Sequence, residues 1–136
     1  MSIRHTKPTA ESIRIVHENP DYVVIEKPAL IDSQDSKEGR ASVVEWLEQK
    51  YRFKGLVHRL DMGTSGLMVC AKNSKTAEYL TTLMQEGGIE RTYQAVVLGK
   101  ISKKSGTLEQ ELEGRKASTH YKVLKTFANA TLVEVE

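Results

Sequence analysis

The feature that most constrains how this chain folds is a turn-forming segment between two short apolar runs. Residues 58–66 read His-Arg-Leu-Asp-Met-Gly-Thr-Ser-Gly, and the small residues that end this string predict a turn. Residues 55–57 before it and residues 67–71 after it predict β-strands, the second of them fully buried. Asp61 is therefore expected at a junction between strand and loop, where a rigid scaffold can aim a side chain into a cleft.

Two other segments show the pattern of helices. Residues 42–51 and residues 74–86 carry apolar side chains at helical spacing. Ser42 with Glu45 predicts a capping box at the start of the first helix, and Gly87-Gly88 predicts the end of the second.

The remaining pattern is that of strands. Residues 13–17 and 22–26 predict a strand pair with a turn at Asn19-Pro20-Asp21. Four more strands are expected after residue 89, over residues 91–98, 107–112, 118–127 and 131–135. Sequential strands mixed with helices predict an α+β fold, with a mixed, mostly antiparallel sheet and flanking helices. A flexible segment over residues 1–11 is expected to precede it.

Composition narrows the classes of protein. A length of 136 residues suits one small domain, and 20 basic against 18 acidic residues is too even a balance to indicate nucleic-acid binding by itself. Cys70 is the only cysteine, which excludes a disulfide framework and favours a buried core thiol. No apolar stretch reaches transmembrane length and no signal-peptide core is present, so we expect a cytoplasmic protein without a membrane partner.

The string around Asp61 is part of a longer resemblance. Residues 58–72 match the signature His-Arg-Leu-Asp-x-x-Thr-Ser-Gly-Leu, an apolar run and Ala-Lys, which resembles the RluA-type RNA pseudouridine synthases. Three further segments resemble that family in its order, at residues 23–28, 91–99 and 117–124. Four ordered matches are far more specific than one short motif, and the resemblance covers residues 12–136. It implies a pseudouridine synthase-like fold.

Two departures from the family pattern stand out. Leu30 occupies a position where the family usually has glycine after Lys-Pro-Ala. Residues 130–136 resemble the strand that leads to a Thr-Gly-Arg-x-His-Gln-Ile-Arg segment, which is absent from this sequence. We therefore expect residues 12–136 to form a partial catalytic domain, incomplete at the C-terminus and without the basic partner of Asp61. An open strand edge at residues 131–135 is expected to cause self-association, or to receive a second chain that supplies the missing half.

Asp61 is the residue to which the resemblance assigns catalysis. Conversion of uridine to pseudouridine breaks an N-glycosidic bond, rotates the base and rejoins it through carbon. This chemistry requires a carboxylate that acts as nucleophile and proton acceptor. The resemblance implies no metal and no organic cofactor, and the sequence shows no metal-ligand cluster. From the residues alone, an Asp that only caps the turn is the alternative.

Four residues are candidates for binding RNA. The resemblance implies that Arg59 displaces the target base and that Tyr93 stacks on it; the alternatives are an ion pair for Arg59 and core packing for Tyr93. Lys27 and Lys72 are expected to contact RNA phosphates, with ordinary surface lysines as the alternative.

The other polar residues of the motif are expected to support it. His58 fits a turn-forming role better than an acid–base role. Thr64 and Ser65 are expected to shape the turn, because no His–acid relay can be placed beside them from the sequence.

Three hypotheses about function follow. The first is an RNA pseudouridine synthase acting on ribosomal or transfer RNA. The second is a truncated, inactive remnant or RNA-binding fragment of such an enzyme. The third, an unrelated small binding domain, is opposed by the four ordered motifs.

Overall fold

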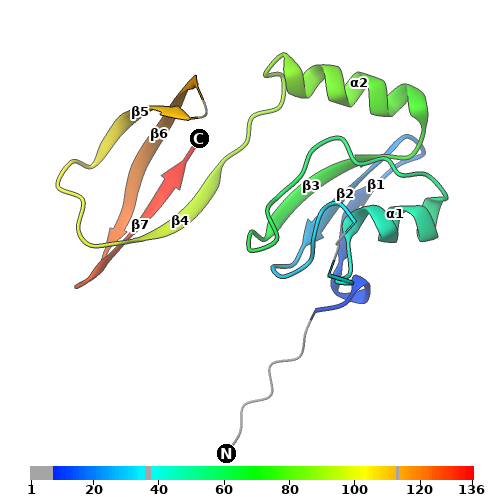
Figure 1. The fold of residues 1–136 in the computed structure, drawn as a ribbon, viewed down its shortest axis with the longest axis horizontal. Coiled ribbons are helices and arrows are strands. Elements are labelled where there is room, and N and C mark those ends of the chain that lie inside the picture. The colour runs from blue at the N-terminus through cyan, green and yellow to red at the C-terminus, as the bar shows by residue number, and fades with distance from the viewer. Residues whose placement is uncertain (1–7, 36–37, 113) are drawn as a thin grey trace, which may run out of the picture. The chain divides into compact units, whose positions relative to one another are not determined.

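The computed structural model describes residues 8–35, 38–112 and 114–136. They belong to two compact units, residues 1–89 and residues 90–136, which we describe separately (Figure 1). Most of the predicted flexible segment, residues 1–11, lies outside the described residues. A short 3-10 helix, η1 (Ala10–Ser12), leads into the first strand.

The first unit contains a three-stranded antiparallel sheet in the order β1-β2-β3. Its strands are β1 (Arg14–Glu18), β2 (Tyr22–Lys27) and β3 (Gly66–Ala71). The predicted pairing of the first two strands is confirmed. The Asn19 side chain forms the turn between them, since its Oδ1 accepts from the backbone N–H groups of Asp21 at 2.8 Å and Tyr22 at 2.9 Å.

Both predicted helices are present, and their ends have local causes. Helix α1 (Val43–Tyr51) begins at Ser42, whose Oγ accepts from the Glu45 backbone N–H at 3.1 Å. Helix α2 (Ser74–Gln85) begins in the same way at Asn73. Gly87 follows it with φ 73°, a left-handed conformation that ends helices and favours glycine.

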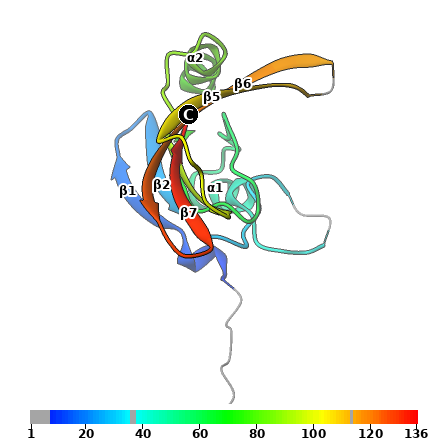
Figure 2. The same ribbon diagram turned by 90° about the vertical axis from the view of Figure 1, so that its left-hand side faces the viewer.

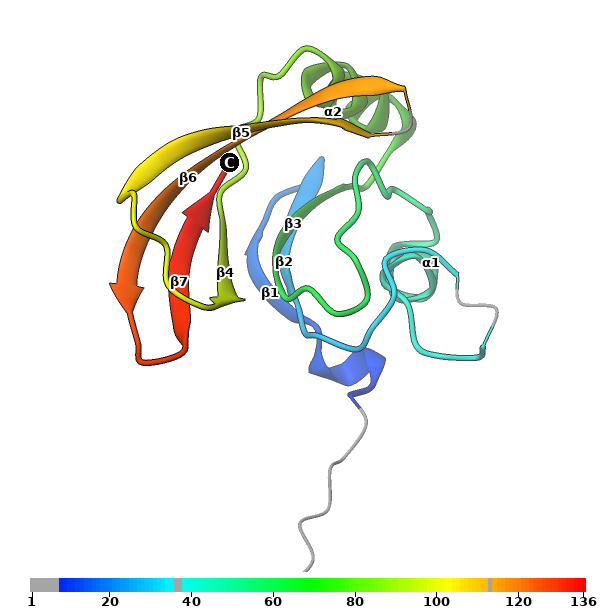
Figure 3. The ribbon, with the colours of Figure 1, turned by 60° about the vertical axis from the view of Figure 1, so that its left-hand side comes forward.

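The core of this unit lies between the sheet and α1, which lies to one side of the sheet (Figure 3). Its fully buried side chains come from β2, β3, α1 and the loop after β2: Val23, Ile25, Ile31, Val43, Leu47, Met68 and Cys70. Cys70 is thus the core thiol that the sequence predicts, and burial raises the pKa of this thiol to about 12.

The two strands predicted around the Asp61 string need correction. Residues 55–57 form no strand; Leu56 makes one isolated bridge to Cys70, and the Gly55 carbonyl accepts from the Ala71 N–H at 2.8 Å. Strand β3 is not fully buried, because its side chains alternate between two faces of the sheet. Met68 points into the core, whereas Leu67 is 61% exposed.

The second unit is a four-stranded antiparallel sheet in the order β4-β7-β6-β5. Its strands are β4 (Tyr93–Leu98), β5 (Ser105–Leu112), β6 (Arg115–Thr126) and β7 (Ala130–Val135). All four predicted strands are confirmed. Strands β5 and β6 form a long hairpin, which extends beyond the predicted bounds (Figure 2).

The predicted open edge at residues 131–135 is wrong. Strand β7 pairs with β4 on one side and β6 on the other, so it lies inside the sheet. Thr131 is 0% and Val133 is 3% exposed, so the inner residues of this strand are covered. The pattern of a single strand carries no information about a partner as distant in sequence as β4. Within the part of the chain that the structure describes, the edges of this sheet are β4 and β5.

The α+β class and the antiparallel pairing of the sequence prediction are confirmed. Every strand pair formed by the described strands is antiparallel. Among the described helices, none is long and apolar enough to cross a membrane.

Candidate active site

The segment around Asp61 forms a tight turn that leads into β3. The Thr64 N–H donates to the Asp61 carbonyl at 2.9 Å, which places Met62 and Gly63 at the centre of a β-turn. Gly66 then begins β3 with φ 146°, a conformation that only glycine adopts readily. The Asp61 side chain is exposed, so its carboxylate is open to a ligand from solvent.

The residue before Asp61 is fixed by a buried serine. Ser33, 4% exposed, donates its hydroxyl to the Leu60 carbonyl at 2.6 Å. The same Oγ accepts the Leu60 N–H at 2.9 Å. Leu60 itself is 7% exposed, with its side chain in the core. Two backbone bonds and a buried side chain thus hold the chain on this side of the carboxylate.

The residue after Asp61 is fixed from the other side. The Leu30 N–H donates to the Met62 carbonyl at 2.7 Å, and the Lys27 Nζ approaches the same oxygen at 3.4 Å. We call residues 27–33 the supporting segment, because its members hold both neighbours of Asp61.

Helix α1 anchors the supporting segment in turn. The backbone N–H groups of Val43 and Val44, the first two residues of the helix, donate to the carbonyls of Asp32 at 2.8 Å and Ser33 at 3.0 Å. These are N–H groups that a helix leaves without partners inside itself. The capped start of α1 is therefore connected through Ser33 to the position of Asp61.

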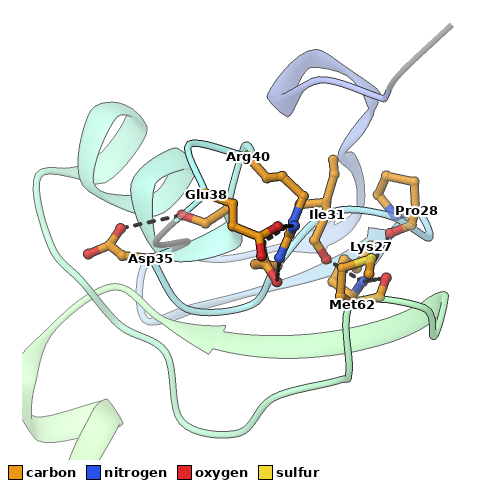
Figure 4. Close-up of polar contacts among 9 residues, drawn as sticks. Lys27, Pro28, Ile31, Asp35, Glu38, Arg40 and Met62 are labelled. Atoms are coloured by element: carbon orange, nitrogen blue, oxygen red, sulfur yellow. Dashed lines mark hydrogen bonds and ion pairs between the residues drawn. The ribbon is translucent and has the colours of Figure 1, made fainter.

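Lys27 has a different place from the one the sequence predicts. Its side chain is 0% exposed, and its Nζ also donates to the carbonyls of Pro28 at 3.0 Å and Ile31 at 2.7 Å (Figure 4). The alternative of a surface lysine is wrong, and a direct phosphate contact does not fit a side chain without exposed surface. The carbonyl oxygens that accept from the amine offset the cost of burying it, and no pattern at Lys27 itself predicts their position.

The buried amine also acts on Asp61 electrostatically. Burial lowers the pKa of Lys27, while the carboxylates of Asp32 and Asp61 oppose that shift. The Lys27 amine and the Asp61 carboxylate therefore attract each other.

An ion pair closes the outer part of the loop between β2 and α1. The Arg40 Nε lies 2.8 Å from Asp32 Oδ2, and a second guanidinium nitrogen contacts Glu38 (Figure 4). The Asp32 carboxylate, with Glu38, raises the pKa of Arg40. This pair joins Arg40, two residues before the cap of α1, to Asp32 of the supporting segment.

Arg59 precedes Asp61 by two residues, in a part of the chain that forms no strand. Leu60 points inward between the two, so both Arg59 and Asp61 are exposed. The Arg59 Nη1 donates to Gln34 Oε1 at 3.4 Å, and within the described residues it forms no ion pair with Asp61. The guanidinium is thus at the surface, two residues before Asp61 in the chain.

His58 supports the turn. Its Nε2 accepts the Val69 backbone N–H at 3.1 Å, which joins the start of the Asp61 segment to β3. A nitrogen that accepts carries no proton, so the neutral ring is protonated at Nδ1. This contact agrees with the predicted turn-forming role.

The structure does not bring Lys72 to Asp61. Lys72 follows β3 at the end opposite Gly66, and its Nζ lies 2.7 Å from Glu18 Oε2 and 4.7 Å from the centre of the Tyr51 ring. The amine therefore fastens β1 and α1 to the end of β3.

Tyr93 belongs to the second unit, at the start of β4, opposite Val135. It is partly buried on the same face as Ala95 and Val97, the face that the strand period predicts. Its role in contacting a base stays a prediction.

Sequence reasoning missed Ser33, and it noted Leu30 only as a departure from the family pattern. Ser33 has no signal in the sequence, because its hydrogen bonds reach a residue 27 positions later. Leu30 has φ 70°, so the position where the family usually has glycine is one whose backbone favours glycine.

The arrangement suits chemistry by a carboxylate. No group of three or more His, Cys, Asp or Glu residues in the described ranges is placed to hold a metal ion. An exposed carboxylate whose neighbours on both sides are fixed can act as a nucleophile or general base with little reorganisation.

Several known proteins are similar to this chain in sequence. The family model described as RNA pseudouridylate synthase matches residues 21–136. Ribosomal large subunit pseudouridine synthase D of Buchnera aphidicola is 33% identical over 142 residues, covering 89% of this chain and 45% of that protein. Ribosomal large subunit pseudouridine synthase C of Rickettsia bellii is 31% identical over 134 residues, covering 85% of this chain and 44% of that protein.

Solved structures show the same fold. Human RNA Pseudouridylate Synthase Domain Containing 1 has a TM-score of 0.76 at 20% identity, covering 96% of this chain and 61% of that chain. Human RNA Pseudouridylate Synthase Domain Containing 4 has a TM-score of 0.72 at 21% identity, covering 90% of this chain and 57% of that chain. The chain spans about half the length of the curated relatives that it matches.

Proposed function

The chain belongs to the RNA pseudouridylate synthase family, and on that premise we propose that it acts in the isomerisation of uridine to pseudouridine in RNA, with Asp61 as the catalytic carboxylate. One observation carries the proposal: Asp61 is exposed, while both of its neighbours are held through their backbone by the supporting segment. Such preorganisation is what a nucleophile or general base requires.

The reaction breaks the bond between the sugar and a ring nitrogen, and forms a bond between the sugar and a ring carbon. Asp61 acts first as the nucleophile: it bonds to the sugar carbon as the bond to the ring nitrogen breaks, and the electron pair of that bond stays with the nitrogen. The bond from Asp61 breaks when the ring carbon joins the sugar. Asp61 then accepts the proton that leaves that carbon, and the proton ends on the ring nitrogen, so that the product is an isomer of uridine. The two hydrogen bonds between the Ser33 hydroxyl and the Leu60 backbone keep the carboxylate in place between these steps.

RNA is the proposed partner. Arg59, exposed beside Asp61, stabilises the RNA from which the target base is displaced, a step that costs about a few kcal/mol. Tyr93 stacks on the displaced base. The relatives named as ribosomal large subunit synthases favour ribosomal RNA over transfer RNA, and cytoplasmic location follows from such a substrate.

The decisive experiment compares the natural chain with Asp61→Asn. Each is incubated with RNA containing labelled uridine, and pseudouridine is measured after nuclease digestion. We expect Asp61→Asn to lower the yield at least about 1000-fold, because the amide is a poor nucleophile and proton acceptor. Glu78→Gln, a change of an exposed acid on α2, is the matched control and keeps full yield. A measurable yield of pseudouridine that is equal for the natural chain and Asp61→Asn contradicts the assignment.

A fragment that binds RNA without turnover is the second candidate. It is favoured by the fact that the chain spans about half the length of its curated relatives. The same experiment separates the two candidates, since a fragment retains RNA in a filter-binding assay but forms no pseudouridine.

Association with a second copy or another chain is part of this proposal. Edge strand β4 exposes Val96 by 67% and Leu98 by 95%, and edges of this kind recruit other chains. Sedimentation at several concentrations tests it, and a monomer at all of them argues against self-association.

A further inference from the structure

Leu30 combines two features that are unfavourable in the free chain. Its φ of 70° is left-handed, which costs free energy for any residue with a Cβ atom. Burial of a large apolar side chain offsets such a cost in many folds, yet Leu30 is 55% exposed. Strain that the fold itself does not compensate is a reason to look for a role in function.

The position of Leu30 connects it to the candidate active site. Its N–H donates to the Met62 carbonyl at 2.7 Å, so its backbone is fixed beside the residue that follows Asp61. Met62 is itself 37% exposed. Exposed apolar groups from two chain segments therefore meet at the residue that follows Asp61, and the exposed Arg59 precedes Asp61 by two residues.

We propose that Leu30 is a substrate-contacting residue that packs, together with Met62, against a nucleobase of the RNA beside Asp61. This inference rests on the proposed function. A base face is flat and apolar, so it removes the Leu30 side chain from water and supplies the burial that the free chain lacks. Phosphate contact is a task for cations, and Arg59 is placed for it.

The proposal predicts effects of opposite sign on folding and on binding. In Leu30→Gly the left-handed backbone is relieved and the side chain is lost. We expect the Tm to rise by about 4 °C, while the Kd for a uridine-containing single-stranded RNA rises about fivefold. Thermal unfolding and fluorescence anisotropy with a labelled oligonucleotide measure the two quantities.

Two further variants serve as controls. Leu30→Met retains an apolar side chain, so its Kd stays within about twofold of the natural chain. Leu108→Ala removes a leucine with a similar exposed fraction, 62%, from β5 in the other unit, and leaves the Kd unchanged.

Three outcomes overturn the inference in different ways. A Leu30→Gly chain whose Kd is unchanged shows that Leu30 does not touch RNA. A lower Tm together with weaker binding shows a purely structural role. If the natural chain itself has no affinity for the RNA, the proposed function fails, and the inference fails with it.

Discussion

The two compact units of this chain differ in how their sheets are supported. In residues 1–89, a three-stranded sheet and α1 enclose a core, and side chains such as Ile25, Leu47 and Met68 have at most 1% exposure. In residues 90–112 and 114–136, the structure shows a four-stranded sheet without a helix, and of the described side chains there only Thr131 and Val133 are buried. The first unit is stabilised by packing, and the second mainly by its strand pairing.

This difference explains where the candidate catalytic residue lies. A carboxylate that must keep its position during a reaction needs neighbours that do not move, and buried Ser33 and Lys27 provide them. The sheet of the second unit leaves large side chains such as Leu98 exposed, which suits contact with another molecule rather than chemistry.

The sharpest test of the comparison is a methyl group added to one glycine in each unit. A Cβ at Gly55 would lie 1.7 Å from the Ala71 carbonyl oxygen, so the backbone must move. A Cβ at Gly106 would meet only the Tyr121 side chain, at 2.9 Å, and that ring can turn away. We expect Gly55→Ala to lower the free energy of unfolding by about 3 kcal/mol, and Gly106→Ala to change it by less than about 0.5 kcal/mol.

Chemical denaturation of both variants, with amide exchange to identify the unit that opens, measures these effects. If the two substitutions lower the free energy of unfolding equally, the first unit is no more tightly packed than the second.

Removal of one hydroxyl from each unit is expected to change the free energy of unfolding less than the glycine substitutions do. Ser33→Ala leaves the buried N–H and C=O of Leu60 without their partner, which costs about 2 kcal/mol. We also expect a lower kcat, since Asp61 loses its alignment when Leu60 is no longer held.

Thr107→Ala is the matched control in the second unit. Its hydroxyl pairs with His120 Nδ1 at 2.7 Å in an exposed position, so its loss costs less than about 0.5 kcal/mol. A Ser33→Ala chain with unchanged kcat would show that Leu60 does not transmit the position of Ser33 to Asp61.

The smallest expected effect is on acid stability. Hydrogen bonds from Lys72 and Tyr51 lower the pKa of Glu18 from its usual 4.5. The folded state therefore binds fewer protons than the unfolded state near that pH, and acidification favours unfolding. The contribution of Glu18 is present above pH 4.5 and is lost as the pH falls through the lower, folded-state pKa.

We expect Glu18→Gln to remove this part of the pH dependence, while Glu109→Gln on exposed β5 leaves it unchanged. Thermal unfolding between pH 3 and pH 7 (about one scan per pH unit) measures it. If the Tm of the natural chain and the Tm of Glu18→Gln fall in parallel as the pH is lowered, the prediction is contradicted.

Local features of the sequence predicted local features of the structure. The caps at Ser42 and Gly87 and the turn at Asn19 involve groups within a few residues of one another, so a short pattern contains all that decides them. The strands of the second unit were also predictable, because each follows from a short local pattern of residues. The position of Asp61 in a turn before a strand was predictable for this reason as well.

By itself, the sequence determined both long helices, most of the strands, their antiparallel class and the string that carries Asp61. Only the tertiary structure decided that β7 lies between β4 and β6, that Lys27 is buried among carbonyls, and that Ser33 holds Leu60. The physical reason is the range of the interactions. Strand partners, burial and bonds between loops join residues that are far apart in the chain, and the identity of one partner does not specify where the other will lie.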